Sequence, residues 1–241
     1  CGTGRKQLHY VGPEVVSICN SLRVLPTEKR RFLSSLNSSE IIHISSHGSE
    51  NYSSPWESTV LGDEFRVVDM AKIGTRASLV AFSCCLSGKG QISSGDDLVG
   101  FSHAVLQSGS LAFIGGLWKV DDATTMLLMH LFYKQLAAQR NDTKGGGTCL
   151  AVAWHRAVRE LYRLDSRSAG TIHDELEEMW KATRGKTTRP EGNFTNLKYM
   201  MDLLRSKIDS GKLDFTLPCY WAPFSLVGYG NAVVLGPLGQ K

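Results

Sequence analysis

The sequence of 241 residues has no apolar run that approaches the roughly 20 residues a membrane-spanning helix needs. Its 24 Gly and 7 Pro follow no collagen-like period, and a charged fraction of 21% is too low for a disordered chain. The six cysteines have no paired metal-binding spacing and are too few for a disulfide scaffold. We therefore expect one globular α/β domain over residues 1–241, not bound to a membrane, in a reducing, cytoplasmic compartment.

The basic residues do not indicate a nucleic-acid surface. Lys and Arg total 27 against 23 Asp and Glu, and they are scattered along the chain. We therefore expect no direct nucleic-acid partner. The chain begins with Cys1 rather than Met, and we expect it to be the C-terminal part of a longer protein.

Apolar runs alternate with helical patterns along most of the chain. Three runs have the β-branched or apolar character of buried strands: 41–46, 79–83 and 111–117. Helices are expected over about 13–23, 97–107, 121–140 and 149–163, with a hairpin around 62–64 and a last strand over 224–228. This order predicts a mostly parallel sheet with right-handed crossovers, flanked by helices.

Residues 165–216 differ from the rest of the chain in being polar and charged. Two helical stretches there, HDELEEMWKA and NLKYMMDLLRSKI, are separated by the breaker-rich TRGKTTRPEGN. The segment interrupts the pattern of strands and helices. We expect it to be a helical insertion or lid that gates the domain or contacts a partner.

Two of the expected strands end in turns that carry a histidine and a cysteine. His47 follows the first strand, and Cys85 follows the second. Neighbouring strands lie about 4.8 Å apart, so side chains at the two ends can approach each other. A cysteine attacks as the thiolate, and an imidazole can accept its proton. Gly48 lets a ligand approach the backbone, and its N–H could join that of Cys85 in an oxyanion hole.

Simpler interpretations stand beside this one. A single histidine is more often structural, and a free cysteine is usually a small buried apolar residue. His43 and His47 would face one metal ion on a helix, but on a strand roughly 13 Å separates them, so we expect no metal. The sequence has no GxxxxGK phosphate loop, which leaves a Rossmann-like nucleotide binder as a weak alternative. We expect no cofactor.

Four segments in order resemble the landmarks of the CHAT domain. They are HISSHG at 43–48, FSCCLSG at 82–88, GGLWKVDDATT at 115–125 and YWAPFSLVG at 220–228. CHAT domains are caspase-like cysteine peptidases of clan CD, related to caspases and separases. The resemblance implies a caspase-like three-layer sandwich with a mostly parallel central sheet.

The resemblance also assigns roles to particular residues. The family's catalytic His before Gly falls on His47, and its catalytic Cys falls on Cys85. Cys84 stands where the family usually has a small residue such as Ala, Ser87 replaces the commoner Thr, and Cys219 stands where a polar residue or His is more usual. None of these departures removes a catalytic group.

Asp121, Asp122 and Trp118 lie in the third landmark. The acidic pair can simply cap the helix that begins there. In the related separases an acidic residue in a similar region faces the specificity pocket, which implies a basic residue at the cleaved position. Trp118 is either a packing residue or part of the substrate crevice.

Together these observations predict a cysteine endopeptidase that acts on a protein or peptide substrate. We expect it to be the effector module of a larger signalling protein, controlled by a sensor or repeat region in the same full-length chain. The alternative is a caspase-like signalling or scaffold domain without proteolytic activity.

Overall fold

A four-stranded sheet forms the centre of the protein. The computed structural model describes residues 8–27, 31–47, 57–60, 65–83, 91–92, 98–118, 120–141, 148–183, 194–231 and 233–234. The strands of the sheet follow the order β1-β4-β7-β9, with bounds Ile41–Ser45, Leu79–Ser83, Ala112–Gly116 and Phe224–Gly228.

The first three strands of this sheet are parallel. Ile41 pairs with Leu79 and Ser45 with Ser83 across β1 and β4, and β4 is parallel to β7 as well. The edge strand β9 runs antiparallel to β7, with Phe224 opposite Gly116. The predicted mostly parallel sheet is confirmed, and the expected strands 41–46, 79–83, 111–117 and 224–228 correspond to its members.

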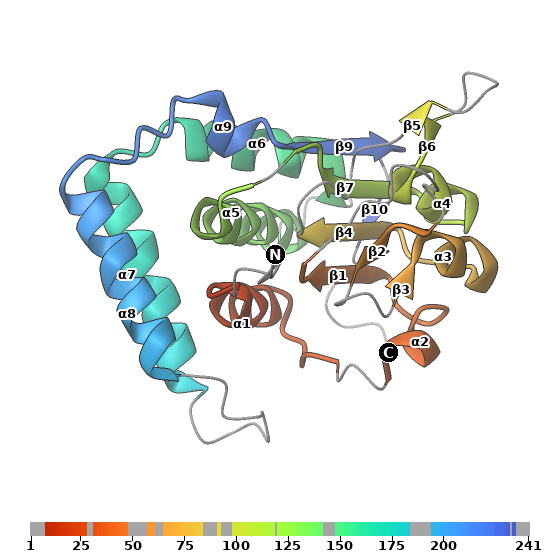
Figure 1. Ribbon diagram of the computed structural model, residues 1–241, viewed down its shortest axis with the longest axis horizontal. Coiled ribbons are helices and arrows are strands. Elements are labelled where there is room, and N and C mark those ends of the chain that lie inside the picture. Colours follow the sequence, from red (N-terminus) through yellow and green to blue (C-terminus); the bar gives the residue numbers. More distant parts are fainter. Residues whose placement is uncertain are drawn as a thin grey trace, which may run out of the picture.

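Helices cover both faces of the sheet (Figure 1). One face packs against α1 (Val11–Leu22), α5 (Asp122–Asn141) and α6 (Leu150–Tyr162), and the other against α3 (Val67–Ile73) and α4 (Phe101–Gln107). Alternation along the strands produces the two cores, because successive side chains point to opposite faces. In β4, Leu79 and Ala81 join the core of α1, α5 and α6, while Val80 and Phe82 join that of α3 and α4.

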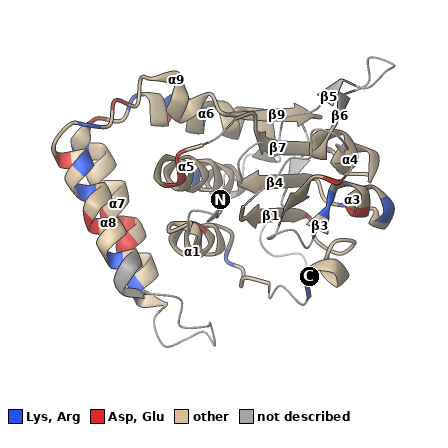
Figure 2. Cartoon of the chain, viewed as in Figure 1, with Lys and Arg blue, Asp and Glu red and all other residues tan. Residues whose placement is uncertain are grey.

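The sheet contains no Lys, Arg, Asp or Glu in its four strands, and Figure 2 shows the charged residues on the surrounding elements. All five residues of β4 and of β7 are buried. A strand covered on both faces has no solvated side, which explains why these two strands read as continuous apolar runs. The three-layer α/β sandwich follows from this pattern.

The segment 165–216 contains the two predicted helices, α7 (Ser166–Ala182) and α8 (Phe194–Asp209), which lie side by side (Figure 1). Asp165 caps α7 by accepting a hydrogen bond from the Ser168 N–H at 2.7 Å. The inner faces of both helices belong to the core shared with α1 and α5, through Ala169, Ile172, Leu176, Leu197, Met201, Leu204 and Ile208.

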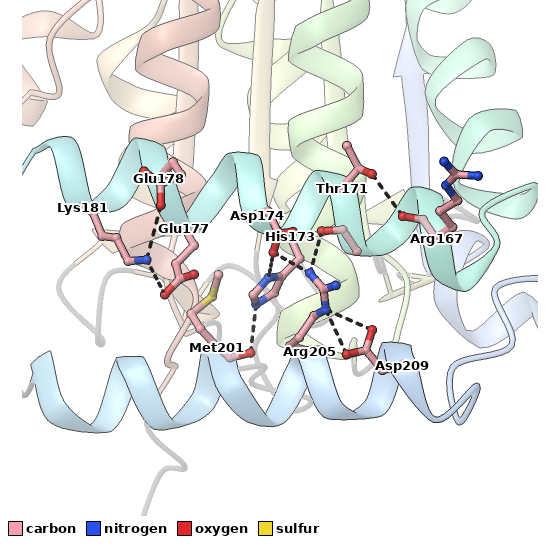
Figure 3. Close-up of polar contacts among 11 residues, drawn as sticks. Arg167, Thr171, His173, Asp174, Glu177, Glu178, Lys181, Met201, Arg205 and Asp209 are labelled. Atoms are coloured by element: carbon pink, nitrogen blue, oxygen red, sulfur yellow. Dashed lines mark hydrogen bonds and ion pairs between the residues drawn. The ribbon is translucent and has the colours of Figure 1, made fainter.

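Polar contacts also join α7 to α8 (Figure 3). The Arg205 guanidinium bonds to the carboxylates of Asp174 and Asp209 and to the Gly170 carbonyl. The buried His173 ring meets the carbonyl of Met201 at 2.9 Å from Nε2. The two helices therefore form a tied pair.

Short elements complete the described chain. The predicted hairpin is confirmed as the antiparallel pair β2 and β3. The helix expected from residue 97 begins only at Phe101, because Leu98 and Val99 form β6 and pair with β5. The bounds of the short elements are α2 Phe32–Ser35, β2 Thr59–Val60, β3 Phe65–Arg66, β5 Gln91–Ile92, β6 Leu98–Val99, β8 Thr148–Cys149, α9 Pro218–Trp221 and β10 Val233–Val234.

Candidate active site

The carboxyl ends of β1, β4 and β7 lie at one edge of the sheet, because the three strands are parallel neighbours. His47 follows β1 by two residues and is partly exposed, and its carbonyl accepts a hydrogen bond from the Ser46 hydroxyl at 3.1 Å. The other predicted members of the site, Gly48 and Cys85, lie outside the described residues, as does Cys84. The dyad and the oxyanion hole therefore stay predictions.

The chain after β7 reaches the same edge. Trp118 is 41% exposed there, which leaves much of its indole accessible to a ligand. The Leu117 N–H donates to the Pro223 carbonyl at 2.6 Å, and this bond ties the residues after β7 to those before β9. The contact of Trp118 with substrate stays a prediction.

Two further aromatic residues lie near this end of the sheet, on and beside α9. The Trp221 ring meets that of Tyr162 edge-on, with centroids 6.1 Å apart. Its Nε1 donates to the Thr216 carbonyl at 3.2 Å. These contacts fix the segment that leads into β9.

Asp121 and Asp122 have different structural roles. Asp121 is exposed, and its Oδ1 accepts a hydrogen bond from the Thr124 N–H at 2.9 Å, which is the geometry of a helix cap. Oδ2 of the partly buried Asp122 accepts from the N–H groups of His9 and Tyr10, at 2.8 and 3.2 Å. Burial raises the pKa of Asp122, and these two hydrogen bonds oppose that rise. Asp122 therefore anchors the segment before α1, while Asp121 still presents its carboxylate to solvent.

A buried polar cluster lies below the site on the α1 and α5 side of β1. His43 Nε2 is 2.8 Å from Glu14 Oε1, and its Nδ1 is 3.1 Å from the Tyr133 hydroxyl. Both nitrogens of the His43 ring therefore have a polar partner, a carboxylate on one side and a hydroxyl on the other. Sequence reasoning placed His43 inside the sheet but missed Glu14, which looks like an ordinary polar position of a helix.

The described ranges contain no cluster of side chains of the kind that binds metals. No group of three or more His, Cys, Asp or Glu among them could hold a metal ion. Within the same ranges, every helix is too short or too polar to cross a bilayer.

A mostly parallel sheet between two helical layers, with a histidine two residues after one strand, is consistent with a caspase-like α/β protein. The family model of the CHAT domain matches residues 18–229, which is most of the chain. The chain therefore belongs to the CHAT family, which is caspase-like and associated with the cysteine peptidases of clan CD. No curated protein was found to match it.

Proposed function

We propose that this chain is a cysteine endopeptidase in which Cys85 is the nucleophile and His47 its general base. The single observation that carries the proposal is the parallel pairing of β1 with β4, whose last pair is Ser45 with Ser83. His47 and Cys85 each follow that pair by two residues. Strand neighbours lie about 4.8 Å apart, so two turns that leave such a pair begin within reach of each other.

The proposed reaction is hydrolysis of a peptide bond. His47 takes the thiol proton of Cys85, and the thiolate attacks the carbonyl carbon to give a tetrahedral oxyanion. The N–H groups of Gly48 and Cys85 stabilise this negative charge. The intermediate collapses as His47 protonates the leaving amine, which gives a thioester. Water, deprotonated by the imidazole, then hydrolyses the thioester and restores the thiol.

Substrate recognition is proposed to involve Trp118 and an acidic residue after β7. Of the two candidates, Asp121 is favoured, because it is exposed while Asp122 already accepts two backbone hydrogen bonds. A carboxylate at this position would favour a basic residue at the cleaved position of a protein or peptide substrate.

The biological setting is also a proposal. The chain would act in the cytoplasm as the effector end of a longer signalling protein, under the control of a sensor or repeat region. The helices α7 and α8 offer a surface for such control, since they are charged on their outer side (Figure 2).

Labelling with a cysteine-directed peptidyl electrophile that carries a basic residue tests the activity. The wild-type chain should be labelled, the variants Cys85→Ala and His47→Ala should not, and Cys84→Ala should be labelled like the wild type. Loss of labelling in Cys84→Ala but not in Cys85→Ala would show that Cys84, and not Cys85, is the nucleophile. A chain that is folded but neither labelled nor able to cleave any protein in a proteome-wide profile would instead be a scaffold domain.

A further inference from the structure

We propose that a pocket between α5, α6 and α7 binds an acidic polypeptide segment, through Arg156, Arg159 and Arg163. The pocket has a volume of about 660 Å³, which lies in the range of ligand-binding sites. It is built by helices on one side of the sheet, and none of the predicted catalytic residues lines it.

The three arginines lie on one face of α6 and its C-terminal end. They are spaced three and four residues apart, so they form a row along the helix that spans roughly 10 Å. All three are exposed, and none forms an ion pair with another residue that the structure describes. Like charges at this spacing repel each other slightly, and an anion bound between them would remove that repulsion.

The acidic residues of the pocket are already engaged. Glu175 pairs with Lys134 at 3.2 Å, and Glu160 accepts a hydrogen bond from Gln135 at 2.9 Å. Neither carboxylate forms an ion pair with one of the three arginines. The end of α6 would attract Arg159 and Arg163 through its helix dipole, but this effect is confined to the last turn and leaves Arg156 unexplained. The row of guanidinium groups is therefore available to a ligand.

The lining of the pocket favours a peptide over a denser polyanion. Beside the arginines it contains Leu164, the buried Ile172 and the hydroxyls of Ser168 and Thr171. Glu160 and Glu175 would repel a chain of closely spaced phosphates. A peptide carries one charge on each acidic side chain, can place these charges at the spacing of the arginines, and has apolar groups for Leu164. Guanidinium binds carboxylate in bidentate geometry as it does phosphate, so the preference for a peptide rests on the other lining residues.

Fluorescence anisotropy with a labelled peptide of alternating Asp, Glu and Leu tests this proposal. The peptide should bind the whole chain, and the affinity should fall as NaCl is raised. The same peptide with Asn and Gln in place of Asp and Glu should not bind. Arg159→Glu should weaken binding by at least about tenfold, and Arg159→Gln by less, because the Glu adds repulsion.

The matched control is Arg76→Glu, which makes the same charge change at an exposed arginine before β4, outside the pocket. It should bind like the wild type, and circular dichroism should show each variant to be folded. Equal weakening by Arg76→Glu would mean that only overall charge matters, and would overturn the proposal. So would failure of the peptide to bind while phosphatidylserine vesicles bind in an Arg159-dependent way.

Discussion

The hydroxyl of Ser17 on α1 is hydrogen-bonded to Nδ1 of His130 on α5, with 2.7 Å between Oγ and Nδ1. Both side chains are buried, and Nε2 of His130 has no hydrogen-bond partner among the described residues. The carboxylate of Glu175 on α7 is 3.7 Å from Nε2, and the charge of Lys134 lies close enough to lower the pKa of the ring. Burial, with a smaller contribution from Lys134, lowers the pKa of His130 from 6.5 to about 4.

This pKa predicts that His130 makes the protein sensitive to acid. Between pH 6.5 and about 4 the unfolded chain binds a proton at His130 that the folded chain does not. The contribution of His130 to the free energy of unfolding therefore has its full value above pH 6.5. It falls by about 3 kcal/mol as the pH drops to 4. Urea unfolding at several pH values should show that His130→Asn loses this part of the pH dependence.

The control for this prediction is His155→Asn, which makes the same substitution at an exposed position of α6. Its pH dependence should match the wild type. If the two variants have the same pH dependence, the buried ring of His130 is not the source of the effect.

The buried pair of Glu14 and His43 predicts strong coupling between α1 and β1. Removing one member leaves the other buried without its partner, so Glu14→Leu and His43→Leu should each lower the free energy of unfolding by about 1–3 kcal/mol. The double variant should lose clearly less than the sum, because neither charge nor donor is then left alone. Additive losses in this double-mutant cycle would show that the 2.8 Å contact contributes no coupling.

Contacts between distant elements could not be predicted from the sequence, whereas the strands could. The strands of the sheet were predictable because a strand buried on both faces reads as an apolar run between turns. Partners across the core, such as Ser17 with His130 and Glu14 with His43, depend on how distant helices pack, and no local pattern contains that information. For the same reason the antiparallel direction of β9 was not predicted.

The candidate site was predictable only in part. The position of His47 after a strand that neighbours β4 followed from the order of the elements. Asp121 and Asp122 look alike in sequence, yet one caps a helix and the other binds the backbone of His9 and Tyr10. That difference arises from the segment before α1, far away in the chain. The helical spacing of the three arginines of α6 is visible in the sequence. Only the structure shows that they line a pocket.

The pair of α7 and α8 is predicted to be necessary for folding. Its buried side chains belong to the central core, and each of the larger ones, such as Leu176 and Met201, contributes about 1.5–3 kcal/mol by leaving water. A whole domain is stable by only about 5–15 kcal/mol, so losing this buried apolar surface should unfold the chain. Replacing 165–216 by a short linker should therefore abolish cooperative thermal unfolding and expose apolar surface to a hydrophobic dye.

A surface change on the same pair serves as the control. Tyr199→Ser alters a side chain that is 63% exposed and should leave thermal unfolding unchanged. If the shortened chain still unfolds cooperatively at the wild-type temperature, α7 and α8 are a separable lid. Tests of gating should otherwise use surface substitutions rather than deletion.

The contact between α1 and α7 predicts an unfavourable Gly12→Ala substitution. Alanine in a helix is normally better than glycine by up to about 1 kcal/mol. At Gly12, however, a Cβ atom would lie only 2.7 Å from Cη2 of Trp180, and such overpacking costs about 1–3 kcal/mol. The clash should outweigh the gain, so Gly12→Ala should lower the free energy of unfolding. Adding Trp180→Leu makes room for the new methyl group, and the alanine should then stabilise this background relative to Trp180→Leu alone. If alanine has the same effect in both backgrounds, the indole does not limit the approach of the two helices.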